Sequence, residues 1–79
     1  MTHEIILNKV NDIFKDVFNR EDLVIDFSTT AKDVEGWDSL QQITLIEAIE
    51  DEFNIRFTMD EVVEMADVGA MIDIILSRI

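Results

Sequence analysis

The sequence predicts an all-α fold: a four-helix bundle with a long loop between the first and second helices and a short third helix. Apolar residues recur at helical spacing in three long segments, and a residue that favours helix starts precedes each expected helix. Only one segment alternates like a β-strand, and a lone strand has no partner with which to form a sheet. With 79 residues, 48% of them hydrophobic, the chain suffices for one core, so we expect residues 1–79 to form a single domain.

The first helix is expected from His3 to Phe18. Thr2 is suited to cap its start, and Glu4 and Arg20 suit the positive and negative ends of the helix dipole. The predicted inner face consists of apolar residues at helical spacing: Ile6, Val10, Ile13, Phe14, Val17 and Phe18.

Residues 19–37 are expected to form an extended loop that ends at Gly36. Leu23, Ile25 and Phe27 alternate with Val24 and Asp26 as in a strand, and we expect their side chains to attach the loop to the bundle. Long connections without secondary structure are usually functional, which draws attention to the end of this loop.

The second helix should begin at Ser39, because Asp38 is a good N-cap and Gln41 stands where a capping box needs it. The predicted inner face consists of Leu40, Ile43, Ile46, Ile49 and Phe53. The polar residues expected largely on the other side are Thr44, Glu47, Glu50, Asp51 and Glu52.

The short third helix should begin after Thr58 and end near Met65. Thr58 and Glu61 have the spacing of a capping box, and Phe57 is placed to pack against Val62.

The fourth helix should begin after Asp67, its predicted N-cap, and Gly69 should weaken it slightly. Its predicted inner face consists of Val68, Met71, Ile72, Ile75 and Ile79.

The charge of the chain limits its partners. Eighteen acidic residues stand against six basic ones, giving a formal net charge of −12. Such a surface repels nucleic-acid phosphates and attracts proteins with basic patches. So small a chain also favours a module over an enzyme.

The chain contains no cysteine, so any sulfur chemistry must come from a group supplied from outside. The N-terminus lacks the pattern of a secretory signal, and no segment reaches the roughly 20 apolar residues of a membrane span. We therefore expect a cytoplasmic protein, without membrane insertion, that is a monomer.

Ser39 is the leading candidate for chemistry. Its expected place in the first turn of a helix would stabilise a phosphate esterified to its hydroxyl, because N–H groups there lack intrahelical partners and the dipole is positive. The alternative is that Ser39 is only a favourable first-turn residue.

The Asp-Ser-Leu sequence that opens this helix, followed by an acidic run ending in Glu-Asp-Glu-Phe, resembles the modification site and second helix of acyl carrier proteins. The resemblance covers nearly the whole chain, including the long loop, the short third helix and the closing helix. It implies that Ser39 carries 4'-phosphopantetheine, which a phosphopantetheinyl transferase takes from coenzyme A with magnesium. Acyl groups would then be held as thioesters and delivered to partner enzymes.

The resemblance also implies roles for neighbouring residues. Asp38 matches the acidic residue before the serine, which contacts the transferase, and Leu40 matches an apolar residue that packs and docks. The positions that match the partner-docking helix of the family are Gln41, Glu47, Glu50 and Asp51.

Three residues depart from the fatty-acid type: Gln41 replaces an acid, Glu47 an apolar contact residue and Trp37 a small residue. The segment Glu-Gly-Trp-Asp-Ser-Leu looks more like the corresponding segment of carriers from specialised pathways, such as polyketide-like, lipid or surface-glycan assembly. Trp37 either anchors the end of the loop or contacts a partner.

Other functions fit less well. The acidic residues around Gly36 lack the spacing of an EF-hand, so no metal site is expected. The only histidine, His3, is an expected surface residue, which leaves a serine hydrolase without a base. Met59, Met65 and Met71 are expected to fill the core rather than to form a cofactor site, and the alternative is that they line a cavity that expands for an acyl chain. A peptidyl or aminoacyl carrier and a non-covalent acidic adaptor remain open alternatives.

Overall fold

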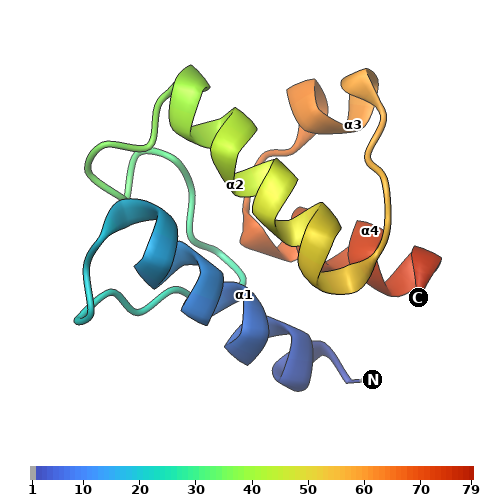
Figure 1. Cartoon of the computed structure of the whole chain (residues 1–79), viewed down its shortest axis with the longest axis horizontal. Helices are drawn as coiled ribbons and strands as arrows, with labels where there is room; N and C mark the ends of the chain where they lie inside the picture. The colour runs from blue at the N-terminus through green and yellow to red at the C-terminus, as the bar shows by residue number, and fades with distance from the viewer. Residues whose placement is uncertain (1) are drawn as a thin grey trace.

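The computed structural model describes residues 2–79 and confirms the all-α prediction (Figure 1). The helices are α1 (His3–Phe18), α2 (Ser39–Phe53), α3 (Met59–Glu64) and α4 (Val68–Arg78). No strand is formed within residues 2–79. The long connection between α1 and α2 loops around one end of the bundle in Figure 1.

The predicted capping residues start all four helices. The side chains of Thr2, Asp38, Thr58 and Asp67 each accept a hydrogen bond from a backbone N–H of the first turn that follows. The capping box of α3 is complete, with the Thr58 N–H donating to the Glu61 carboxylate at 2.8 Å. The box predicted for α2 forms only in half, because the Asp38 N–H donates instead to the carbonyl of Gly36 at 3.1 Å.

Two asparagines end the long helices. Asn19 closes α1 and Asn54 closes α2, both in the left-handed conformation with φ of 53° and 54°. Asparagine tolerates this conformation better than most residues, and it turns the chain sharply at a helix end. Neither helix end depends on a glycine.

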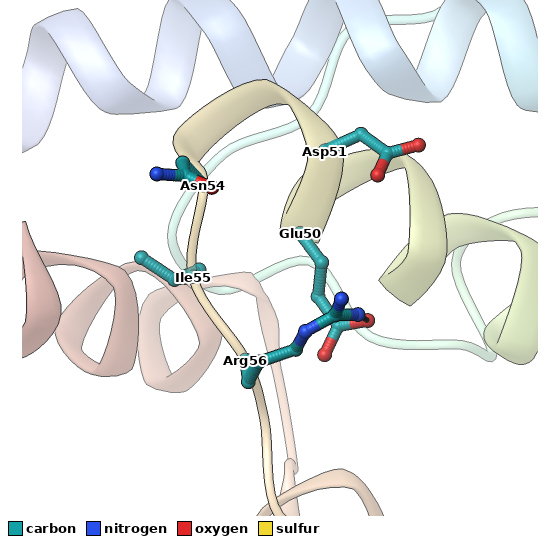
Figure 2. A pocket seen from close by; sticks show the side chains of 5 residues that line it. All are labelled: Glu50, Asp51, Asn54, Ile55 and Arg56. Atoms are coloured by element: carbon teal, nitrogen blue, oxygen red, sulfur yellow. Dashed lines mark ion pairs between the residues drawn. The ribbon is translucent and has the colours of Figure 1, made fainter.

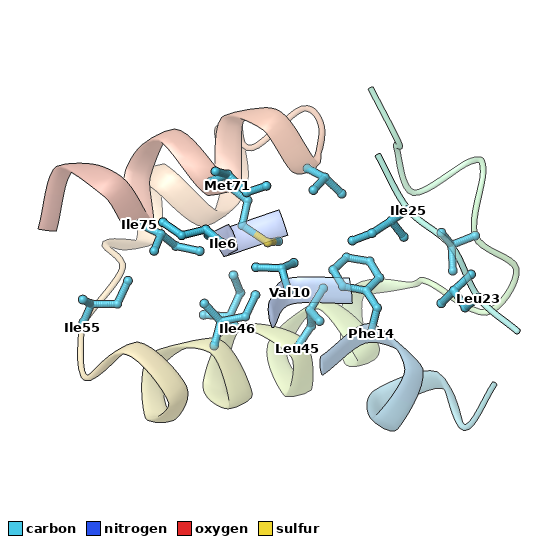
Figure 3. Close-up of a cluster of buried hydrophobic side chains, with 14 residues drawn as sticks. Ile6, Val10, Phe14, Leu23, Ile25, Leu45, Ile46, Ile55, Met71 and Ile75 are labelled. Carbon is cyan, nitrogen blue, oxygen red and sulfur yellow. The ribbon is translucent and has the colours of Figure 1, made fainter. Parts of the chain in front are cut away.

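The core lies between α1, α2 and α4, where buried side chains from all three helices meet (Figure 3). The buried helical residues are Ile6, Val10, Phe14, Leu45, Ile46, Ile49, Val68, Met71, Ile72 and Ile75. By contrast, α3 contributes no buried residue.

The loop between α1 and α2 is held by one side chain of α1 that forms hydrogen bonds with two backbone groups of the loop. Asn11 of α1 donates to the carbonyl of Leu23 at 3.1 Å and accepts from the N–H of Ile25 at 2.6 Å. This pairing buries Leu23 and Ile25, as predicted. Phe27 is more exposed than Leu23 and Ile25, but its ring lies edge to face against His3 of α1 with centroids 6.1 Å apart. The prediction did not include Val34, which is buried.

The loop also caps α4. The N–H groups of Val68 and Gly69 donate to the carbonyls of Thr29 and Phe27 at 2.9 and 2.8 Å. A Cβ at position 69 would lie 2.9 Å from the carbonyl oxygen of Phe27, too close for another residue without a shift of backbone. The sequence analysis considered only the cost of Gly69 to the helix, and the structure adds the reason for it, since this close approach requires a glycine.

Three apolar residues predicted to face the core do not. Leu40 is 76% exposed and Ile43 is also exposed, because α2 faces the core with Leu45, Ile46 and Ile49 instead. Leu45, absent from the predicted face, is fully buried instead. Ile79 is exposed because it lies beyond the end of α4 at Arg78.

Candidate functional site

Ser39 lies where the long loop meets α2. Gly36 adopts a φ of +88°, which turns the chain, and Asp38 then caps the helix by accepting the N–H of Gln41 at 2.9 Å. Ser39 is therefore the first helical residue, and it is exposed. Within residues 2–79 its hydroxyl makes no hydrogen bond.

The start of α2 fits a phosphate ester at Ser39. The first N–H groups of any helix have no carbonyl one turn earlier to bind, and here the Asp38 side chain pairs only with Gln41. The N–H groups of Ser39 and Leu40 thus remain to stabilise negative charge, together with the positive end of the helix dipole. This local environment offsets part of the repulsion from a chain with a net charge of −12.

Trp37 fixes the end of the loop. Its ring meets Phe14 edge to face, with centroids 5.1 Å apart, and also lies near Phe18. Its indole N–H donates to the side-chain oxygen of Gln42 at 2.5 Å. The structure thus supports the anchoring role among the two weighed for Trp37. It also reveals Gln42, which the sequence analysis did not single out.

A groove of about 540 Å³ opens beside Ser39, between α2, α3 and the loop. Its walls are largely apolar, with Ile43 from α2 facing Met59, Val62 and Val63 from α3. Met59 is 81% exposed, so the prediction that it fills the core was wrong. Met71 is buried and Met65 is half-buried against the core, as predicted.

The acidic residues of α2 divide into two groups. Glu47 and Asp51 are exposed, and with Leu40 they have the spacing of one helix face, which we call the outer face of α2. Gln41, another of the four predicted docking residues, is half-buried.

Glu50 turns away from the outer face (Figure 2). Its side chain is only 13% exposed, accepts the N–H of Phe57 at 2.9 Å and lies 3.6 Å from the guanidinium of Arg56. Glu50 thus ties the connection between α2 and α3 to the end of α2. The structure gives it a role in the fold that its acidic character alone did not indicate.

Other candidate chemistry is limited. Within residues 2–79 no three His, Cys, Asp or Glu side chains gather to hold a metal ion. His3 is exposed, as predicted, and its ring lies 3.1 Å from the carboxylate of Asp73. Over the same residues, the helices are too short or too polar to cross a membrane.

Comparisons with known proteins agree with this geometry. Residues 8–75, a range that includes Ser39, match the family described as the phosphopantetheine attachment site. The structure also matches the solution NMR structure of a holo acyl carrier protein from Geobacter metallireducens, with a TM-score of 0.85 and 30% sequence identity. The match covers 91% of this chain and 83% of that one. The chain therefore belongs to the family of phosphopantetheine-dependent carrier proteins, as a carrier of the acyl carrier type with a covalently attached 4'-phosphopantetheine.

Proposed function

We propose that Ser39 is the attachment point of the phosphopantetheine, and that the chain carries acyl groups as thioesters and delivers them to partner enzymes. The observation that carries this proposal is the exposed, unpaired hydroxyl of Ser39 at the first position of α2, next to an apolar groove. When attached, the phosphopantetheine supplies the thiol that a chain without cysteine lacks. Catalysis belongs to the partners, and the chain is not itself an enzyme.

The residues around Ser39 have separate tasks in this proposal. The N–H groups of the first turn of α2 stabilise the phosphate diester. Asp38 sets where the helix begins and offers a carboxylate to the transferase. Trp37 holds the loop against Phe14, so that Ser39 is presented from a fixed backbone.

Partner enzymes with basic patches would dock on the outer face of α2. Leu40 supplies an exposed apolar contact beside Ser39, while Glu47 and Asp51 supply exposed carboxylates. Exposed ion pairs contribute only about 0–1 kcal/mol each, so such a complex would form fast and dissociate easily, as a shuttle requires. Gln41 would contact partners at the edge of this face. Glu50 is the least suited of the predicted docking residues, because it is engaged with Phe57.

The pathway stays a prediction. Trp37, Gln41 and Glu47 favour a specialised polyketide-like, lipid or surface-glycan pathway over general fatty acid synthesis. The cytoplasmic location and the monomeric state are likewise predictions. Competing loading assays with acyl and aminoacyl donors would separate an acyl carrier from a peptidyl or aminoacyl carrier.

Intact-mass measurement tests the attachment site. After incubation with coenzyme A, magnesium and a broad-specificity transferase, the chain should gain one phosphopantetheine. Ser39→Ala should abolish the gain, whereas the control Ser77→Ala, at an exposed serine near the end of α4, should keep it. An unmodified wild-type mass beside an active control carrier would refute the proposal.

The Ser39→Ala variant also distinguishes a carrier from a non-covalent adaptor. An adaptor that only presents an acidic face would keep its cellular activity in Ser39→Ala. A carrier would lose that activity while the helical circular dichroism spectrum stays unchanged.

A further inference from the structure

Gln42 is a polar residue in the groove that the proposed function leaves without a task. Four residues with polar side chains other than Trp37 line this groove: Asp38, Ser39, Gln42 and Asp67. Asp38 caps α2, Asp67 caps α4 by accepting the N–H of Ala70, and Ser39 is the proposed attachment point. Gln42 lies half-buried among apolar walls.

The orientation of the Gln42 amide is fixed by its neighbour. The Trp37 indole nitrogen can only donate, so the Gln42 atom 2.5 Å away must be the amide oxygen. The amide nitrogen therefore points the other way, where its one partner within residues 2–79 is the sulfur of Met65 at 3.9 Å. A thioether is a weak acceptor, and an amide nitrogen carries two hydrogens. The groove thus contains an oriented donor with capacity for an oxygen acceptor.

We propose that Gln42 donates a hydrogen bond to a carbonyl oxygen of the group tethered at Ser39, and so selects groups that lie in the groove. This inference rests on the proposed attachment at Ser39. Ser39 and Gln42 are three residues apart on α2 and therefore neighbours on its surface. A saturated alkyl chain offers no acceptor, whereas the amide carbonyls of the arm and the second carbonyl of a 3-oxoacyl group do. The arm amides are common to every cargo, so the substrate class that Gln42 can select by this bond is a 3-oxoacyl group.

The expected effect is modest. One neutral hydrogen bond in a half-buried place changes an equilibrium by roughly twofold to tenfold. Among residues 2–79, the only contact of the amide nitrogen that the carbonyl displaces is the one with Met65. Trp37 prevents the amide from flipping, so the donor needs no reorganisation when the carbonyl arrives.

Hydrogen exchange of the Gln42 side-chain amide tests the inference. The full chain is prepared in apo, holo, butyryl and 3-oxobutyryl forms, each verified by intact mass, and exchange is measured by NMR. Exchange slower than in the apo form by roughly twofold to tenfold in the holo, butyryl and 3-oxobutyryl forms alike identifies an amide carbonyl of the arm as the acceptor. Slower exchange only in the 3-oxobutyryl form identifies the acyl carbonyl.

Exchange as fast as in the apo form in every loaded sample would overturn the inference while leaving attachment at Ser39 intact. A chain that gains no mass would overturn the attachment itself, and the inference with it. The two failures are therefore distinguishable.

Two variants give a second readout, the change in the Met59 methyl signal when the chain is loaded. Gln42→Glu keeps an acceptor for Trp37 but removes the donor, and Gln42→Met removes both without adding charge. Both should reduce the fraction of the tethered group in the groove by roughly twofold to tenfold. Thr44→Glu, exposed and outside the groove, controls for the added charge and should keep the wild-type change. Wild-type changes in both Gln42 variants would count against the inference.

Discussion

The two sides of this bundle are built differently. Where α1 and α4 pack, residues such as Ile6, Val10 and Ile75 are fully buried. On the side of α3, no helical residue is buried, and Met59 and Val63 are largely exposed. Partly buried Phe57, Val62 and Met65 pack against the core there, and the Glu50–Phe57 hydrogen bond and the Glu61–Arg78 ion pair add polar contacts. Stability is thus concentrated away from Ser39, while the groove beside Ser39 stays open.

Phe14→Ala should produce the largest effect, because it removes the centre of the packed side. Phe14 is fully buried and also supports Trp37. Truncation of a buried phenylalanine typically lowers the free energy of unfolding by about 3–5 kcal/mol. In so small a domain, that loss should leave much of the chain unfolded at 25 °C, as measured by urea denaturation followed by circular dichroism.

Val63→Ala truncates a valine on the open side, and Val10→Ala, at a fully buried valine of α1, is its matched truncation on the packed side. Val63 is largely exposed, so the free energy of unfolding of the Val63→Ala variant should stay within about 0.5 kcal/mol of wild type. Equal losses in the two variants would contradict the division of the bundle into a packed and an open side.

Glu50→Ala should produce the next largest effect, because Glu50 connects α2 to the segment before α3. The variant leaves the N–H of Phe57 without its acceptor, in a place where Glu50 is only 13% exposed. An unsatisfied group of this kind lowers the free energy of unfolding by about 1–3 kcal/mol. Glu47→Ala, exposed three residues earlier, should change it by less than about 0.5 kcal/mol. Similar values for both variants would show that Glu50 is an ordinary surface acid.

Local signals in the sequence predicted much of the fold. Helix starts follow from single capping residues such as Asp38 and Thr58, whose effect is confined to one turn. The position of Ser39 at a helix start followed from the same signal. The attachment of the loop at Leu23 and Ile25 was also predicted, although its partner, Asn11, was not.

The remaining features depend on contacts between distant segments. Periodicity marks Leu40 and Ile43 as apolar, but it does not show that α2 faces the core with Leu45, Ile46 and Ile49. Gly69 is required only because the carbonyl of Phe27 lies against it. For Gln42 one signal was present: a half-buried Trp37 needs an acceptor for its indole N–H.

Glu61→Gln should show how the open side depends on pH. The Arg78 guanidinium donates to the Glu61 carboxylate at 2.7 and 2.5 Å and lowers its pKa from 4.5 to about 2. Because the pKa is lower in the folded state, the pair stabilises the fold above pH 4.5, and this contribution is lost as pH falls toward 2. Glutamine keeps an oxygen for the N–H of Thr58. The variant should therefore melt below wild type at pH 7, and the difference should vanish near pH 2.

The exposed Glu64 provides the control for this experiment. Glu64→Gln removes the same charge from α3 without breaking an ion pair or hydrogen bond found within residues 2–79. Its melting temperature should stay close to wild type at pH 7. If Glu61→Gln and Glu64→Gln melt alike at every pH, the Glu61–Arg78 pair does not hold α3.

Removing one charge from the outer face of α2 should have the smallest effect, on docking rather than on stability. Glu47→Gln or Asp51→Asn removes one exposed carboxylate, and one exposed ion pair changes an equilibrium by about 0–1 kcal/mol, or up to roughly fivefold. Stopped-flow modification by the transferase should slow by that factor at low salt, and the difference should disappear near 1 M salt, where the Debye length falls to about 3 Å. Asp12→Asn removes an exposed charge from α1 and should leave the rate nearly unchanged. Equal slowing by Asp12→Asn would mean that net charge, rather than the outer face of α2, guides the encounter.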